Sequence, residues 1–274
     1  MAKNYIWDAK DYQKNSQNQY AWAQELIPKL HLQGNETLLD IGCGDGKITA
    51  QIAKALPNGR VIGIDSSPNM INLAQTLFPQ TDSPNLSFQL ADAKNFDFPQ
   101  IFDRIFSNAA LHWIPNQAAV LSCVEKCLKP DGRLLFQMAG KGNAQNILDI
   151  LDEMLPVEPW RQHFEGFSFP YGFFDPQEYT AFLQKAGLKP LRVERIPKDM
   201  KLAGAEGLAG WVRTTWLPFT EKLPDMLKTK FVDELVTRYI QKHPVDAESN
   251  VHVGMIRLEV EAKKPSVNNF LTLS

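Results

Sequence analysis

Short apolar runs alternate with helix-like segments along the first half of the chain. Each run is bounded by turn residues, a pattern typical of strands in a parallel sheet that is covered on both faces. The predicted strands span residues 37–41, 60–65, 86–90, 103–107 and 132–138. The predicted helices between them span residues 47–56, 68–77 and 116–128. This alternation predicts an α/β fold in which a parallel sheet carries helices on both faces.

The second half of the chain has a different pattern. Residues 140–175 are rich in aromatic side chains, residues 176–187 indicate a helix that ends at a glycine, and residues 188–196 indicate a strand. Residues 197–250 look mostly helical, whereas residues 251–262 alternate as in a long strand. The two further strands would complete a Rossmann-like, seven-stranded, mostly parallel sheet with a helical and aromatic cap.

The length of 274 residues and the apolar fraction of 44% allow one large α/β domain with a full core. We expect a single domain over residues 1–274. Its core would comprise residues 36–139, 176–196 and 251–262, and its cap residues 1–35, 140–175 and 197–250.

The segment from Leu38 to Gly46 carries the strongest chemical signal. It runs from an apolar strand through Gly-Cys-Gly-Asp-Gly into a predicted helix. That layout brings backbone N–H groups and the positive end of a helix dipole close to a ligand. Asp65 ends the next predicted strand about twenty residues later, where an acid can accept hydrogen bonds from a ribose diol. The two features together predict a site for a nucleoside-bearing cofactor.

Two cofactors compete for this site, and the charges favour one of them. Dinucleotide sites need G-x-G-x-x-G, whereas this chain has G-x-G-x-G with Asp40 just before the first glycine. A doubly anionic pyrophosphate is poorly served by Asp40 and Asp45, while a sulfonium cation with an amino-acid ammonium is well served. The sequence therefore favours S-adenosyl-L-methionine over NAD, and disfavours a nicotinamide dehydrogenase.

The charge balance and composition argue against several partners. The net charge is −2, from 29 basic and 31 acidic residues, and neither a basic nucleic-acid face nor a polyacidic tail is visible. No long apolar run indicates a signal peptide or a membrane span, so we expect a cytoplasmic protein without membrane or nucleic-acid partners. Cys123 and Cys127 lack neighbours at zinc spacing, and we expect no metal. The oligomeric state stays open.

Several segments resemble those of one enzyme family. They are residues 40–46, 63–70, 92–93, 108–114 and 128–132, preceded by a leader with Tyr12-Gln13-Lys14-Asn15-Ser16 and Gln19. The chain resembles the class I S-adenosylmethionine-dependent methyltransferases. Within them it is similar to small-molecule carboxyl O-methyltransferases of the trans-aconitate and juvenile hormone acid methyltransferase group. The Leu-His-Trp-Ile segment at residues 111–114 is the narrower motif and carries most of the subfamily assignment.

The resemblance implies a set of cofactor-binding residues at the strand ends. The turn would approach the methionine and ribose parts through its backbone, with Asp40 near the methionine ammonium and Asp65 on the ribose hydroxyls. Asp92 would accept a hydrogen bond from the adenine amino group. The full set is Asp40, Gly42, Cys43, Gly44, Asp65, Ser66, Met70, Asp92, Ala93, Asn108 and Ala109.

The acceptor side of the site depends on what is methylated. A carboxylate is ionised at neutral pH and needs no base. Neutral donors can hold it without strongly lowering the nucleophilicity of its oxygen. The resemblance gives this task to Gln19 and Trp113. If the acceptor is a hydroxyl or an amine, His112 could take its proton; otherwise His112 orients its loop by one hydrogen bond. Candidate partners for a second acid group on the substrate are Arg161, His163, Arg213 and Arg257.

The leading hypothesis is therefore an O-methyltransferase that methylates the carboxylate of a small, at least partly apolar organic acid. One alternative is the same fold acting on a hydroxyl, an amine, a carbon or a carrier-bound acyl group. A further alternative is a non-catalytic domain that binds S-adenosylmethionine. The aromatic cluster between Trp160 and Phe174 could line an apolar substrate pocket, or it could be ordinary core beneath a long insert.

Overall fold

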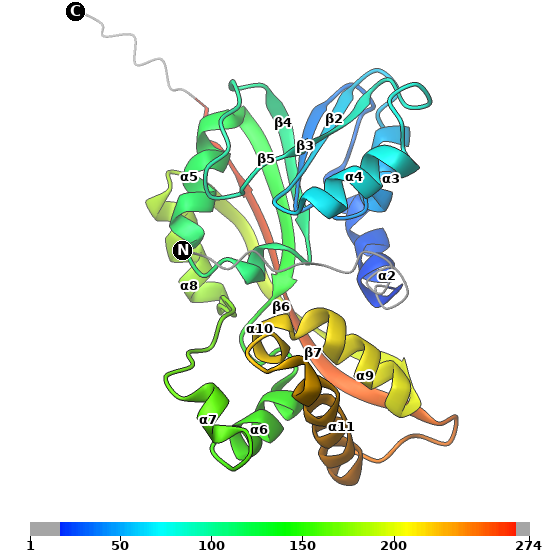
Figure 1. Ribbon diagram of the computed structural model, residues 1–274. Helices are drawn as coiled ribbons and strands as arrows, with labels where there is room; N and C mark the ends of the chain where they lie inside the picture. The colour runs from blue at the N-terminus through cyan, green and yellow to red at the C-terminus, as the bar shows by residue number, and fades with distance from the viewer. Residues whose placement is uncertain (1–16, 267–274) are drawn as a thin grey trace, which may run out of the picture.

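The computed structural model describes the backbone of residues 17–266 and the side chains of residues 20–266. Seven strands form one sheet in the order β3-β2-β1-β4-β5-β7-β6 (Figure 1). The strands are β1 (Thr37–Ile41), β2 (Arg60–Asp65), β3 (Leu86–Leu90), β4 (Phe102–Asn108), β5 (Leu128–Ala139), β6 (Lys189–Ala203) and β7 (Asn250–Lys263). Strands β1 to β5 are parallel, while β7 runs antiparallel to both β5 and β6. The predicted seven-stranded, mostly parallel sheet is confirmed.

Helices cover both faces of this sheet, as predicted. One face packs α2 (Gln17–Leu26), the short η1 (Ile27–Leu30), α3 (Lys47–Lys54) and α4 (Pro68–Leu77) in a shared apolar cluster with β1, β2 and β3. The opposite face packs α5 (Gln117–Cys127) and α8 (Pro176–Lys185) in a second cluster. The 3-10 turn η2 (Leu111–Trp113) follows β4. Apolar side chains on both faces explain why the central strands are continuous hydrophobic runs.

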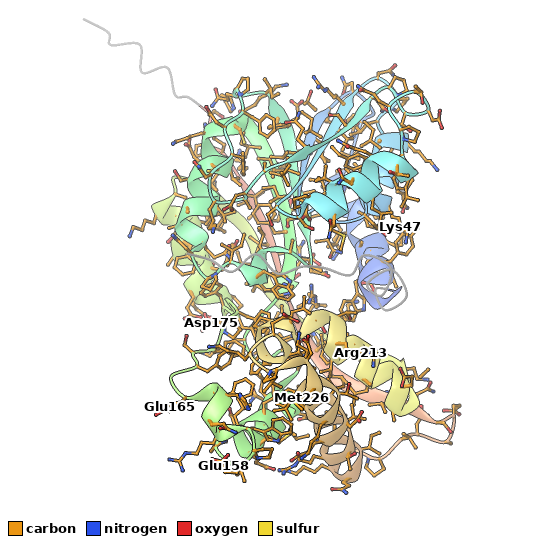
Figure 2. The ribbon with its side chains drawn as sticks, in the orientation of Figure 1. Lys47, Glu158, Glu165, Asp175, Arg213 and Met226 are labelled. Carbon is orange, nitrogen blue, oxygen red and sulfur yellow. The ribbon has the colours of Figure 1, made fainter. Side chains whose placement is uncertain are left out.

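A third apolar cluster belongs to a group of helices beyond the carboxyl ends of the parallel strands (Figure 1). This helical layer comprises α6 (Gln145–Met154), α7 (Arg161–Phe164), α9 (Gly204–Thr215), α10 (Leu217–Thr220) and α11 (Asp225–Lys242). Strand β5 ends at Ala139, opposite Arg257, whereas β6 and β7 remain paired as far as Ala203 and Asn250. This extension of β6 and β7 carries the helical layer, whose apolar side chains pack on Met200, Val251 and Val253 of the two strands (Figure 2).

Local sequence signals set several helix starts. Pro68 occupies the first turn of α4, and the hydroxyl of Ser67 accepts a hydrogen bond from the N–H of Met70. At α8, Asp175 and Glu178 form a reciprocal capping box, each carboxylate accepting the other residue's backbone N–H at 2.9 Å. Both caps fix the first residue of their helix.

The last part of β6 differs from the sequence prediction. Residues 197–203 were expected to be helical, but they continue β6 and pair with residues 250–256 of β7. Pro190 and Pro197 lie within this strand, and it tolerates them because β6 is the edge of the sheet. Strand β5 likewise begins earlier than predicted, at Leu128 and not at Gly132, and Asp131 within it has a left-handed φ of 60°. Among the described residues, no helix is long and apolar enough to cross a membrane.

Candidate cofactor and acceptor site

A cavity of about 290 Å³ lies at the carboxyl ends of the parallel strands. One half is lined by the residues that follow β1, β2, β3 and β4, and the other half by η2, β7 and the helical layer. Open α/β sheets bind ligands at this edge. The volume is near the lower bound for small-molecule sites. We call the two parts the cofactor half and the acceptor half.

The glycine turn after β1 forms the floor of the cofactor half. The N–H groups of Gly42 and Cys43 both donate to the carbonyl of Ile64, at 2.7 and 3.0 Å, which ties the turn to β2. Gly42 has a φ of 77°, and a Cβ there would lie 2.2 Å from the Cβ of Ala110. Gly44 has a φ of 54°, and nothing lies within 4 Å of a Cβ built on it. Gly44 therefore presents bare backbone to open space, which suits the close approach of a nucleoside cofactor.

Asp65 ends β2 beside this turn. Its Oδ2 accepts the N–H of Gly44 at 3.1 Å, and its Oδ1 accepts the N–H of Ser67 at 2.8 Å. Burial raises the pKa of this carboxyl, and the backbone hydrogen bonds oppose that rise. A carboxylate has about four acceptor positions, so these backbone donors leave room for a ligand hydroxyl, and Asp65 lines the cavity. This geometry fits a ribose diol.

Two of the predicted cofactor residues have side chains that do not line the cavity. Asp40 is 2% exposed, and its Oδ2 accepts the hydroxyl hydrogen of Thr49 at 2.7 Å. Burial raises the pKa of Asp40 to about 7; Thr49 lowers it and the charge of Asp65 raises it further. Cys43 is also buried, and burial raises the pKa of its thiol. Asp40 and Cys43 are thus not among the residues that line the cavity.

All other predicted cofactor residues line the cavity. They are Gly42, Gly44, Asp65, Ser66, Met70, Asp92, Ala93, Asn108 and Ala109. Met70 is buried in the first turn of α4. The side chain of Asp92 is about half exposed and lies 3.3 Å from the ammonium of Lys94. Ala109 adopts a left-handed φ of 55°, and its N–H donates to the carbonyl of Gln137 at 2.8 Å.

His112 lies on η2 at the border of the acceptor half. Its Nδ1 accepts the backbone N–H of Ala139 at 3.4 Å, and its carbonyl accepts the N–H of Gly172 at 2.8 Å. Burial lowers the pKa of the imidazole well below its usual value, and the nearby charge of Arg257 lowers it further. The ring is therefore neutral, and because Nδ1 is the acceptor, the proton resides on Nε2. His112 can donate a hydrogen bond from Nε2 but cannot accept one there.

Trp113 forms part of an aromatic wall. Its ring meets Tyr171 edge-on at a centroid distance of 5.1 Å, and Tyr171 stacks on Phe173 at 5.4 Å. The hydroxyl of Tyr171 donates to the carbonyl of Thr215 at 2.8 Å, which ties the wall to α9. Tyr171 and Phe173 line the cavity, whereas Trp160 is buried in the core of the helical layer. The aromatic cluster therefore divides between pocket and core.

Of the four side chains considered for a second acid group, Arg257 is the one that lines the cavity. It lies on β7, is 3% exposed, and its guanidinium stands 5.2 Å from the ring centroid of Trp22. Arg213 lies on α9 (Figure 2), where it pairs with Glu206. Arg161 and His163 lie on α7, away from the cavity lining. The side chain of Gln19 falls outside the described residues, although its backbone belongs to α2.

The acceptor half also contains residues that the sequence analysis did not assign to the site. They are Trp22, Asn143, Trp211, Thr215, Trp216 and Met255. Trp22 lies on α2, three residues after Gln19 in the sequence. The loop residue Asn143 carries no comparable signal. The acidic residues that line the cavity within the described chain, Asp65 and Asp92, both belong to the cofactor half, and the described residues contain no metal-binding cluster.

Comparison with known proteins agrees with this site. The family model for a methyltransferase domain matches residues 32–187, more than half of the chain. The chain belongs to this family: it is a class I S-adenosylmethionine-dependent methyltransferase, and S-adenosyl-L-methionine is its cofactor. The family assignment excludes the nicotinamide dehydrogenase.

Individual relatives extend the comparison over the whole fold. The chain is 28% identical over 265 residues to the trans-aconitate 2-methyltransferase of Methylobacterium radiotolerans, covering 95% of this chain and 99% of the relative. A structure from Bacillus halodurans, described as a candidate methyltransferase, has a TM-score of 0.61 at 19% identity, covering 90% of this chain and all of that one. Phosphoethanolamine N-methyltransferase 2 of Haemonchus contortus, solved with S-adenosyl-L-methionine, has a TM-score of 0.59 at 19% identity, covering 94% of this chain and 57% of that one.

Proposed function

We propose that this enzyme methylates a carboxylate oxygen of a small organic acid. The observation that carries the proposal is the hydrogen bond from the N–H of Ala139 to Nδ1 of His112, which leaves the histidine a donor toward the acceptor half. Donors suit an acceptor that arrives already ionised. The cation Arg257 in the same half adds a charge complementary to an acid. The similarity to trans-aconitate 2-methyltransferases supports the same class of acceptor.

Methyl transfer to a carboxylate requires little of the protein beyond positioning the acid. When bound, S-adenosyl-L-methionine supplies a methyl group activated by a sulfonium, and its transfer to a carboxylate gives a methyl ester without removal of a proton. The chain must then hold the acid in line and keep water away. The aromatic wall of Trp113, Tyr171 and Phe173 provides a dry surface for this purpose.

We assign the cofactor half by the residues that line it. Gly44 would offer its bare backbone, and Asp65 would accept the two ribose hydroxyls. Met70 would pack against the adenine with Ser66 beside it, and Asp92 with Ala93 would contact its edge. Asn108 and Ala109 would border the methionine arm. Asp40 would act from behind the turn, by supporting it through Thr49.

We assign the grip on the reacting carboxylate to neutral donors. Trp113 and His112 lie on the same turn of η2 and both line the cavity. Gln19 would join them from α2, as the family resemblance implies. Neutral donors orient a carboxylate while leaving its oxygen nucleophilic, whereas a bidentate guanidinium would hold both oxygens tightly.

A hydroxyl or amine acceptor fits this geometry less well. It would need His112 as a base at Nε2, which requires the proton to move to Nδ1. At Nδ1 the proton would face the N–H of Ala139, and the hydrogen bond between them would become a clash of two donors. We therefore place the alternative acceptors second.

We further propose that the chain is a single domain in which the helical layer caps the site. Residues of η2, α9 and the loop around Tyr171 meet at the cavity, and the apolar cluster of the layer continues onto Trp22 of α2. Closure of such a layer over the cofactor would exclude water during transfer.

A panel assay tests the proposed acceptor. The enzyme is incubated with methyl-labelled cofactor and separate carboxylic acids, phenols, primary amines and acyl-carrier thioesters of similar size. We expect label in one or more of the acids and none in the other classes. Transfer to phenols or amines with no acid methylated would overturn the proposal.

A further inference from the structure

Aromatic rings line much of the acceptor half. Six of its described residues are tryptophan, tyrosine or phenylalanine, and they come from α2, η2, α9 with the residue after it, and the loop before α8: Trp22, Trp113, Tyr171, Phe173, Trp211 and Trp216. We propose that these rings select a monocarboxylic acid that carries an aromatic ring, with Phe173 as a determinant of that specificity. The inference rests on the proposed carboxyl methylation and names the class of acid that is methylated.

Contacts between the rings hold them in fixed orientations. Besides its contacts with Trp113 and Phe173, Tyr171 meets Trp216 edge-on at a centroid distance of 5.7 Å. Trp216 in turn meets Trp211 edge-on at 5.8 Å. Each ring therefore restricts the next before a ligand arrives. A further aromatic ring can join such a set through edge-to-face or offset-stacked contacts, whereas a saturated ring can only fill the space.

The polar groups on this side of the cavity are directed into the protein. The hydroxyl of Tyr171 donates to the carbonyl of Thr215 at 2.8 Å, and the hydroxyl of Thr215 donates to the carbonyl of Trp211. Nε1 of Trp216 is inaccessible to solvent. This side therefore presents the carbon surfaces of its rings to a ligand.

Phe173 is the ring best placed to contact the body of the acid. Four of the six aromatic side chains are buried, whereas Phe173 and Trp113 are only partly buried. Trp113 is assigned to the reacting carboxylate. Phe173 stacks on Tyr171 with 17° between the ring planes, and its partly accessible ring lines the cavity. We therefore expect the acid's ring to lie against Phe173.

The charges of the cavity fit an acid with one carboxylate. The cations among its described lining residues are Lys94 and Arg257, and Lys94 pairs with Asp92 in the cofactor half at 3.3 Å. Within that lining, the acceptor half thus has one cation, which itself stands 5.2 Å from the ring centroid of Trp22. Each further carboxylate would leave water without a charge of its own to face, which is costly.

Matched acids test the selection for a ring. Phenylacetate and 3-phenylpropionate are each compared with the cyclohexyl analogue, and all four acids with the tricarboxylate trans-aconitate. A cyclohexyl group is at least as hydrophobic as a phenyl group, so hydrophobicity alone would not favour the phenyl acid. The wild-type kcat/KM should be about 2- to 13-fold higher for the phenyl member of each pair. It should be at least about tenfold higher for the phenyl acids than for trans-aconitate.

A pair of neighbouring substitutions tests the role of Phe173. Phe173→Leu keeps an apolar side chain and removes the ring, so it should bring the phenyl and cyclohexyl acids closer to equal kcat/KM. Phe174→Leu is the matched control, because Phe174 packs against Tyr179 and Phe182 and does not line the cavity. This control should keep the wild-type preference. A preference that Phe173→Leu leaves unchanged would overturn the role of Phe173.

The outcomes separate the two proposals. Wild-type enzyme that methylates phenyl and cyclohexyl acids equally, or that prefers trans-aconitate, would overturn the selection for an aromatic monoacid while leaving carboxyl methylation intact. Wild-type enzyme that methylates no carboxylic acid would overturn both. If Phe173→Leu does not fold, calorimetry on the wild type with S-adenosylhomocysteine still decides the matter, since phenylacetate should bind more tightly than cyclohexylacetate, and equal affinities would overturn the proposal.

Discussion

The backbone N–H of Ala139 donates to Nδ1 of His112 across 3.4 Å, from the last residue of β5 to the turn that follows β4. One main-chain hydrogen bond thereby decides the tautomer of the imidazole. Because of this hydrogen bond, His112 faces a ligand as a hydrogen-bond donor and not as a base. The choice between carboxylate and hydroxyl acceptors depends on this relationship.

Substitution of His112 should separate a donor from a base. A glutamine amide can donate a hydrogen bond but cannot remove a proton, so His112→Gln should stay within about tenfold of the wild-type kcat, while His112→Leu should lose about 10- to 150-fold. Steady-state kinetics on the best acid substrate measures both. Equal and severe loss in the two variants would contradict the donor role.

The pH dependence of turnover follows from the same residue. The pKa of His112 lies well below its ordinary value, so the ring charges only when the pH falls well under about 6.5. We expect kcat to show no change in slope near pH 6.5 on the wild-type enzyme. An inflection at that pH that disappears in His112→Gln would show that the imidazole titrates normally.

Substitution of Trp113 should lower turnover without changing the affinity for the cofactor. Trp113→Phe keeps an aromatic ring beside Tyr171 and removes the indole N–H, so kcat should fall about 10- to 150-fold. Gln19→Ala should behave in the same way. Calorimetry with S-adenosylhomocysteine should give unchanged affinity for both variants, and wild-type turnover in both would remove their assigned role.

The glycine turn allows a matched pair of substitutions. Gly44 and Gly187 both have a positive φ, and a Cβ placed on either would have no atom within 4 Å. Alanine at either position should cost about 1–2 kcal/mol of unfolding free energy through left-handed strain. Only Gly44→Ala should also weaken binding of S-adenosylhomocysteine, because only Gly44 faces the cavity. Equal cofactor affinity in the two variants would place the ligand elsewhere.

Asp65 should dominate cofactor affinity among the nearby acids. Asp65→Asn replaces a charged acceptor of the ribose hydroxyls and should weaken S-adenosylhomocysteine about 10- to 150-fold. Asp45→Asn is the control, since Asp45 pairs with Lys47 at 2.9 Å and does not line the cavity. Titration calorimetry on both variants measures the difference, and similar losses would indicate a general charge effect.

His252 should make stability depend on pH. Its two ring nitrogens face Asp199 at 2.6 Å and Asp246 at 2.8 Å, and these hydrogen bonds raise the pKa of His252. A raised folded-state pKa gives a contribution that is complete below the unfolded value of about 6.5 and is lost as pH rises through the folded value. Denaturant unfolding of His252→Gln should therefore show a larger deficit at pH 6 than at pH 9, and the reverse order would contradict this.

The sheet could be predicted because its strands are apolar on both faces and its turns carry distinct residues. The end of β6 could not be predicted, because Pro197 indicates the end of a strand unless the position is already known to be a sheet edge. Helix-forming residues beyond it reinforced the wrong assignment of residues 197–203. Pairing with β7 overrides those local preferences.

The cofactor half was predictable for a similar reason: a glycine turn and an acid at fixed spacing define one short stretch of chain. The acceptor half brings together residues far apart in the sequence. Nothing local distinguishes Arg257 from Arg213; the difference is that Arg257 faces Trp22 and the cavity from the middle of the sheet. Asn143 depends in turn on the backbone of Ile256, a contact that exists only after folding.

The bond formed in the product is the most direct test of the central claim that a carboxylate accepts the methyl group. The labelled product of the best acceptor is isolated and treated with mild alkali, which hydrolyses methyl esters but not methyl ethers, methylamines or C-methyl groups. We predict that the label is released as methanol and that the parent acid is recovered. Label that stays on the acceptor through this treatment would contradict the account.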